Sequence, residues 1–208
     1  MVYKSRCGLP RFRLLYCRSD SIRVVTAITD LRIVAIKWGS AIRAGRSWRV
    51  DETYVRVAGH WTYLYRAVDS AGNMLDFLLS PYRDVIGAKG FLQLAIAQAG
   101  RMQPRIINVD GHPAYPAAVA DLKRSGELGR RCRCRRSPYL NNILEQDHRF
   151  VKKRVAASQW FRSIGGALNT IAGYEAMNII RKGQIRWLPR TDVVGQVRFI
   201  ERMFGIAA

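Results

Sequence analysis

Three acidic residues occupy positions where a carboxylate could do chemistry rather than simply face solvent. Asp51 interrupts a run of β-branched and aromatic residues, Asp110 follows a short apolar segment, and Glu145 stands near the start of an amphipathic segment. Acids are depleted in strand interiors. Magnesium prefers oxygen ligands, and phosphoryl transfer uses two divalent ions about 3.5–4 Å apart. The pattern therefore indicates a candidate magnesium site.

Two of these acids also have a purely structural interpretation. Asp51 and its neighbour Glu52 must point to opposite faces of a strand because strand side chains alternate, so we expect one of them to be solvated. The sequence does not decide which one. Asp110 precedes Gly111 and could be a turn residue that binds local amides.

Glu145 belongs to the stretch NNILEQDHRFVKKR, which we expect to be helical. Asn142 and Glu145 have the spacing of a capping box. On a helical wheel, however, Glu145 shares a face with cations that could neutralise phosphates. The cations of this stretch taken as DNA contacts are Arg149, Lys152 and Lys153. Residue types alone support the cap and the metal ligand about equally.

The elements that must position these acids can be predicted from periodicity and turn signals. Three strand-like segments with short turns predict an antiparallel meander, at 48–59, 60–69 and 74–80. Asp69, in the turn DSAGN, is interpreted as a turn acid. The later elements expected are a helix at 84–99, a strand at 105–110, a helix at 113–123, an extended segment at 130–136, the helix at 141–154 and a last helix at 165–182 that stops at Gly183.

The element order β-β-β-α-β-α-β-α-α predicts an α/β fold. It has a mixed five-stranded sheet with flanking helices, which is the order of an RNase H-like domain of the retroviral-integrase superfamily. If the first and fourth strands are neighbours, Asp51 and Asp110 come close together. The helix at 141–154 then has only to lay Glu145 over that pair.

The charge of the chain points to a polyanionic partner. The 208 residues include 35 Lys and Arg against 15 Asp and Glu, a net charge of +20. Nucleic acid is the first choice and an anionic membrane surface the second. No apolar run of about 18 residues is present and we find no signal peptide, so we expect no membrane partner.

The cysteines do not have the arrangement of a zinc site, which needs four convergent ligands. They are Cys7, Cys17, Cys132 and Cys134. We expect reduced, non-catalytic thiols in a cytoplasmic protein.

Two further motifs have alternative interpretations. The basic segment RRCRCRR could be a strand whose Arg133 and Arg135 face DNA, or a solvated basic loop, which is the usual state of a charge run. The aromatic residues of HWTYLYR favour a place in the core over a base-stacking platform.

Three motifs carry a resemblance to a known family. WRVDETYVRVAGHWTYLYRAVDSAGNMLDFLLS, IINVDGHPAYPAA and YLNNILEQDHRFVKKR, in that order, resemble the catalytic domain of bacterial insertion-sequence transposases of the DDE class. The similarity is greatest to insertion sequence family six, and it covers about 47–184. The spacing of Asp110 and Glu145 and the later stretch YEAMNIIRKGQI also fit this family.

The resemblance implies the reaction and the role of each residue. Asp51, Asp110 and Glu145 would be the ligands of two Mg²⁺ ions, for which Mn²⁺ can substitute, and Lys152 would contact the transposon end. Hydrolysis would free a 3′-hydroxyl at the element's end, and that hydroxyl would then attack target DNA. The implied partners are the terminal inverted repeats, target DNA and further copies of the chain, assembled on DNA at the bacterial nucleoid.

The N-terminal segment departs from the family pattern. Family members carry a helix-turn-helix ahead of the catalytic domain, whereas residues 1–46 are β-branched, basic and without helix caps. We therefore predict a domain boundary near Gly45, with an atypical segment at 1–46 and the catalytic domain at 47–208. The alternative function is an inactive remnant that only binds DNA, with little sequence discrimination.

Overall fold

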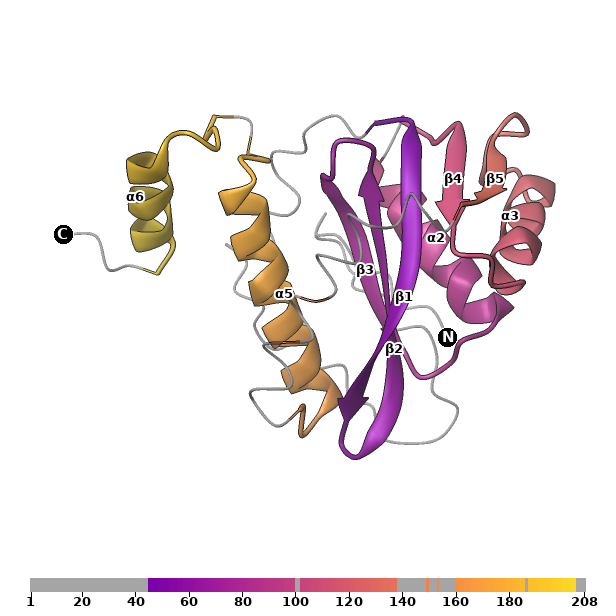
Figure 1. Cartoon of the computed structure of the whole chain (residues 1–208), viewed down its shortest axis with the longest axis horizontal. Helices are drawn as coiled ribbons and strands as arrows, with labels where there is room; N and C mark the ends of the chain where they lie inside the picture. Colours follow the sequence, from indigo (N-terminus) through magenta and orange to yellow (C-terminus); the bar gives the residue numbers. More distant parts are fainter. Residues whose placement is uncertain are drawn as a thin grey trace, which may run out of the picture.

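The computed structural model describes residues 45–99, 102–137, 149, 153, 160–185 and 187–204. These residues form a five-stranded sheet with helices on its two faces (Figure 1). The strands are β1 (Ser47–Val57), β2 (His60–Asp69), β3 (Met74–Ser80), β4 (Ile106–Val109) and β5 (Arg133–Arg136). The helices are α2 (Val85–Ala99), α3 (Ala114–Arg124), α5 (Ile164–Arg181) and α6 (Val193–Phe204).

The first three strands form the antiparallel meander that the turn signals predict. β1 and β2 are joined by two residues, Ala58 and Gly59, which both have positive φ (49° and 83°). This backbone twist suits a two-residue hairpin. Asp69 ends β2 and accepts hydrogen bonds from the backbone N–H groups of Gly45, Ala71 and Asn73. The interpretation of Asp69 as a turn acid is confirmed.

The second half of the sheet is parallel. The strand order is β3-β2-β1-β4-β5, and β4 pairs in parallel with both β1 and β5. In the β1–β4 register, Trp48 lies opposite Ile107 and Arg49 opposite Asn108. Continuing that register by two residues places Asp110 beside Asp51. The predicted neighbourhood of the first and fourth strands, and with it the mixed five-stranded sheet, is confirmed.

The main core lies between the sheet and the pair α2 and α3 (Figure 1). Trp48 and Val50 of β1 point into it and are fully buried, together with Phe91 of α2 and Tyr115 of α3. Because side chains alternate along a strand, the even-numbered residues of β1 face this core. Glu52 follows Val50 on the same face.

The opposite face of the sheet packs against α5. Val55 and Val57 of β1 meet Ala167 and Ile171 of the helix in a second cluster. The odd-numbered residues of β1, Asp51 included, therefore face this side. β1 thus contributes to both cores, as β2 and β3 also do.

A buried ion pair joins α5 to the sheet at the level of Asp51. Arg66 of β2 lies directly opposite Asp51 in the β1–β2 register. Its guanidinium approaches the carboxylate of Glu175 on α5 to 2.8 Å, and the two side chains are 0% and 2% exposed. Burial of two ions costs desolvation energy that their mutual attraction must offset, so a shift of α5 that separated the two side chains would be costly.

The end of α5 also follows the sequence signal. Gly183 has φ +67°, and the N–H groups of Gly183 and Gln184 bond the carbonyls of Ile180 and Ile179. This is the Schellman pattern of a helix stop. A Cβ at Gly183 would lie 2.3 Å from the backbone nitrogen of Arg190, so glycine is required there. The prediction that 165–182 is the last helix is wrong, because α6 follows it.

The remaining predictions have mixed outcomes. The other predicted elements agree with α2, β4, α3 and β5 to within a residue or two, apart from the longer extended segment around β5. In the expected helix at 141–154, Arg149 and Lys153 are helical, and the rest lies outside the described residues. The predicted N-terminal segment, apart from its last two residues, also lies outside them. None of the helices described is long and apolar enough to span a membrane.

We predict that Glu175→Ala lowers the free energy of unfolding by about 3–5 kcal/mol, because it leaves the Arg66 guanidinium buried without this carboxylate. Urea denaturation of the full chain would measure the loss. Replacing both partners with apolar residues, as Arg66→Met with Glu175→Leu, should recover much of it. The control is Arg124→Ala, which breaks an exposed pair with Asp121 and should cost less than about 1 kcal/mol. A Glu175→Ala loss no larger than this control would contradict the prediction.

Candidate active site

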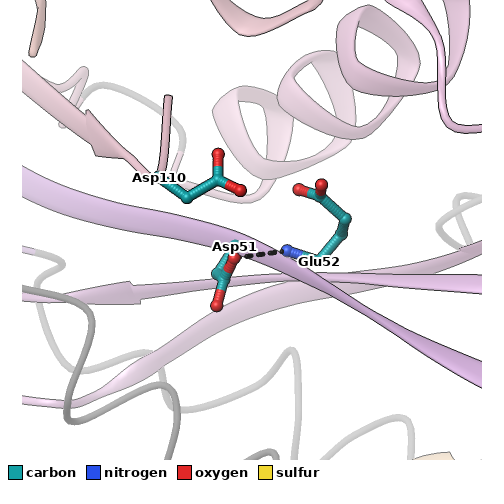
Figure 2. A group of neighbouring side chains, drawn as sticks. All are labelled: Asp51, Glu52 and Asp110. Carbon is teal, nitrogen blue, oxygen red and sulfur yellow. Dashed lines mark hydrogen bonds between the residues drawn. The ribbon is translucent and has the colours of Figure 1, made fainter. Parts of the chain in front are cut away.

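Three carboxylates converge where β1 passes the end of β4. Asp51, Glu52 and Asp110 each offer an oxygen, and these oxygens all lie within 4.8 Å of one another. Figure 2 shows Glu52 and Asp110 on one side of the β1 ribbon and Asp51 on the other. The distances between their oxygens confirm the expected approach of Asp51 and Asp110. Glu145 lies outside the described residues, so its convergence with them stays a prediction.

Asp51 is a half-buried acid inside a strand. One of its oxygens, Oδ1, accepts the backbone N–H of Glu52 at 3.0 Å (Figure 2). Burial, followed by the negative charges of Glu52 and Asp110, raises the pKa of the Asp51 carboxyl to about 7, although this hydrogen bond and Arg83 both act to lower it. Near neutral pH the carboxyl is therefore poised between its charged and neutral forms.

Asp110 has the two properties that the sequence left as alternatives. It is a turn residue, because its Oδ1 accepts the backbone N–H of His112 at 3.0 Å and Gly111 has φ +123°. It also stands beside Asp51, with a side chain 33% exposed. The turn fixes the carboxylate and does not remove it from the cluster.

The burial of Glu52 contradicts a prediction made from strand alternation. We expected either Asp51 or Glu52 to be solvated, yet both are half-buried as residues, and the Glu52 side chain is only 3% exposed. Its Oε2 accepts a hydrogen bond from the hydroxyl of Tyr115, and its Oε1 accepts the Nε of Arg83 at 2.6 Å. The expectation failed because these two groups from the α2 and α3 side cover the carboxylate.

Tyr115 and Arg83 are site residues that the sequence analysis did not identify. Tyr115 lies on the first turn of α3, five residues after Asp110. Its closeness to Asp110 in the sequence could have identified it as a candidate site residue. Burial raises the pKa of the Tyr115 hydroxyl, and the charge of Glu52 raises it further, so the group remains a donor. Arg83 lies in the loop between β3 and α2, and no sequence pattern marks it.

The donor set fits a hard divalent cation. Asp51 and Asp110 provide only carboxylate oxygens, the ligand type that Mg²⁺ prefers, and both are partly open to water. Burial and then the crowding of like charges raise the pKa of Asp51, and a bound cation would relieve that repulsion. Glu52 is the poorer candidate ligand, because both of its oxygens already accept hydrogen bonds.

The cations predicted to bind DNA are exposed wherever the structure describes them. Those on β5 are Arg133 and Arg135, and those in the expected helix are Arg149 and Lys153. Lys152 lies outside the described residues.

The two described cysteines are free, and burial raises the pKa of the Cys132 thiol to about 11, so that thiol remains protonated at neutral pH.

The aromatic residues of β2 only partly follow the expected place in the core. Tyr65 is 1% exposed and stacks on Phe91 of α2. Trp61 instead is 53% exposed near the hairpin and makes edge contacts with Tyr54 and Trp160. The prediction of a core position is right for Tyr65 and wrong for Trp61.

The strand order, the antiparallel meander and the two parallel strands define an RNase H-like protein with its acids at the β1–β4 junction. Residues 45–184 match the family model described as a DDE domain. The chain therefore belongs to the DDE domain family of insertion-sequence transposases.

Curated relatives agree with this family. The chain is 38% identical over 146 residues to the transposase for insertion sequence-like element IS431mec of Staphylococcus aureus. The identity and the coverage are the same for the transposase of insertion sequence element IS257 in transposon Tn4003 of that species. The match covers 70% of this chain and 62% of the relatives, so the matching region spans about three fifths of their length.

Solved structures of retroviral integrases are also similar. The HTLV-2 integrase catalytic core domain in complex with magnesium, in its trimeric form, gives a TM-score of 0.49 at 14% identity, over 76% of this chain and 98% of that one. The BIV integrase catalytic core domain gives 0.43 at 17% identity, over 77% and 99%. The fold assignment itself rests on the strand order and pairing.

We predict that, without metal, the stability of the wild type falls relative to that of Asp51→Asn as pH rises from about 4 to about 7. The folded state holds the Asp51 proton up to about pH 7, whereas the unfolded chain releases it near pH 4. The folded state thus binds more protons in this window, and stability declines as pH rises. Above about pH 7 the difference should stay constant.

Urea unfolding in EDTA across this pH range would measure the difference, which should be on the order of a few kcal/mol. Adding Mg²⁺ above pH 7 should then stabilise the wild type more than Asp51→Asn. A stability difference that does not change with pH would contradict the shifted pKa.

Proposed function

We propose that the chain is a DDE transposase that cleaves the 3′ ends of an insertion sequence and joins them to target DNA. The observation that supports this proposal most directly is the approach of Asp51 and Asp110, at adjacent parallel strands, in a chain of the DDE domain family. In this proposal Asp51, Asp110 and Glu145 hold two Mg²⁺ ions, which Mn²⁺ can replace. The bound ions would lower the pKa of an attacking water and stabilise charge on the phosphate.

The residues of the chain supply position and charge. β1 and the turn after β4 hold Asp51 and Asp110 at a fixed separation, so binding of cations there needs little rearrangement of the backbone. Asp51 must release its proton to act as a ligand. In the first reaction water attacks the phosphodiester and the 3′-hydroxyl leaves with a proton. In the second, that hydroxyl attacks a target phosphodiester and displaces another 3′-oxygen.

The DNA would be held by exposed cations. Arg133 and Arg135 lie on the strand next to β4, and Arg149 and Lys153 are exposed. Glu145 and Lys152 belong to the same stretch of the sequence, 141–154. Arginine and lysine side chains bind phosphates and release counterions. The partners proposed are the terminal repeats, target DNA and further copies of the chain, assembled on DNA of the bacterial nucleoid.

Asp51→Asn, Asp110→Asn and Glu145→Gln should each reduce cleavage to background while leaving DNA binding within about twofold, because each removes a metal-ligand charge and no phosphate contact. The substrate is supercoiled plasmid carrying the DNA that flanks this reading frame, with Mg²⁺ or Mn²⁺. Nicking is followed on gels and binding by anisotropy.

The matched control for these variants is Asp121→Asn, an acid on α3 that pairs with Arg124 and should leave cleavage unchanged. A variant that cleaves at nearly the wild-type rate would show that its residue is not a ligand. A wild-type chain that binds this DNA but never nicks it would favour the remnant that only binds DNA.

Lys152→Ala should weaken DNA binding and reduce the slope of log affinity against log salt by about 0.9, because one fewer counterion is released. Affinity would be measured by anisotropy at several salt concentrations with a labelled duplex of the DNA that flanks this reading frame. Lys182→Ala is a control of equal charge, since Lys182 caps the end of α5 and donates to the carbonyl of Gly72. Equal slopes for the wild type and Lys152→Ala would count against the phosphate contact.

A further inference from the structure

Arg83 places a positive charge at the edge of the carboxylate cluster. Its Nη2 lies 2.5 Å from Oε1 of Glu52 and 3.6 Å from Oδ2 of Asp110. The Arg83 side chain is nevertheless 42% exposed. It therefore contacts an acid of β1 and the acid that follows β4, and can still be reached by a ligand from solvent.

Glu52 has the geometry of an anchor for this arginine. One of its oxygens accepts from Arg83 and the other from Tyr115, whose ring is buried in the main core at 1% exposure. The Glu52 side chain is itself 3% exposed. A carboxylate fixed at both oxygens holds the guanidinium in one orientation, because a charge-assisted hydrogen bond is short and directional.

A phosphodiester that approaches this cluster meets strong repulsion. Asp51, Glu52 and Asp110 bring three acids together, and in the described part of the chain Arg83 places a guanidinium against two of them. The planar guanidinium has five N–H donors, and its fork matches two phosphate oxygens. Arg83 can therefore keep its contact with Glu52 and use its other donors for a phosphate.

We propose that Arg83 is a DNA-phosphate contact beside the metal ligands, and that Glu52 and Tyr115 are positioning residues that hold it there. This role rests on the proposed function, since it takes DNA as the substrate. Under this proposal the acids of the cluster have different roles. Asp51 and Asp110 bind cations, whereas Glu52 orients an arginine.

The first test is DNA binding by the full chain in EDTA, measured by anisotropy over a series of salt concentrations. Arg83→Ala should weaken binding roughly tenfold and reduce the salt slope by about 0.9, the value for one lost phosphate contact. Arg83→Lys should keep the slope but recover only part of the affinity, because the planar fork is lost. The matched control is Arg124→Ala, whose arginine pairs with Asp121 on α3 and should bind as the wild type does.

The second test measures Mn²⁺ binding without DNA, by electron paramagnetic resonance. Arg83→Ala should bind Mn²⁺ several-fold more tightly, because a positive charge 3.6 Å from Asp110 has been removed. DNA affinity and metal affinity should therefore change in opposite directions. A loss of both would indicate a merely structural role for Arg83 and would overturn the proposal.

The positioning role is tested by a double-mutant cycle. Tyr115→Phe keeps the ring and removes the hydroxyl that holds Glu52, so it should weaken DNA binding a few-fold when Arg83 is present. In the Arg83→Ala background the same change should have no further effect, because the contact on which it acts is gone. An equal loss in both backgrounds would show that Tyr115 does not act through Arg83.

The outcomes distinguish the two proposals. If the wild-type chain does not bind DNA, the proposed function fails and the role of Arg83 fails with it. If the wild type binds DNA and Arg83→Ala behaves as Arg124→Ala does, the proposed function stands and the Arg83 proposal alone is wrong.

Discussion

Repulsion between carboxylates is the constraint on which the arrangement around β1 depends. Oxygens of Asp51, Glu52 and Asp110 lie within 4.8 Å of one another, a separation that the unfolded chain would avoid. The folded chain holds them there with a parallel strand pair, a backbone turn after β4 and the cation of Arg83. The repulsion that remains contributes to the raised pKa of Asp51. Such stored unfavourable energy is typical of sites built to receive a cation.

The two cores hold this unfavourable cluster in place because β1 belongs to both. Its even-numbered side chains pack under α2 and α3, and its odd-numbered ones pack under α5. Neither face of the strand can therefore shift without disturbing a packed layer. The buried Arg66–Glu175 pair lies at the level of Asp51 and adds a directional contact to the second face. The strand that carries the site is therefore packed on both of its faces.

Local signals were enough to predict much of this fold, and long-range contacts between polar groups were not predictable. Turn chemistry and periodicity located the meander, the Asp69 turn and the stop at Gly183, since each depends on a few adjacent residues. The solvation expected of Asp51 or Glu52 was wrong because Tyr115 and Arg83, distant in sequence, cover Glu52. Sequence patterns cannot foresee a buried pair such as Arg66 and Glu175, because either residue alone is typical of a surface. The approach of Asp51 and Asp110 was predictable once the first and fourth strands were taken as neighbours.

The charge on β5 has a consequence for how copies of the chain can meet. Among the described strands, β5 is an outer strand of the sheet, and its Arg133, Arg135 and Arg136 are all exposed. An open strand edge is a template for aggregation through pairing with another chain, and charged side chains prevent it. Two copies aligned edge to edge here would bring arginines against arginines. The same arginines that would allow β5 to bind a polyanion therefore oppose strand pairing between copies of the DNA-free protein at this edge.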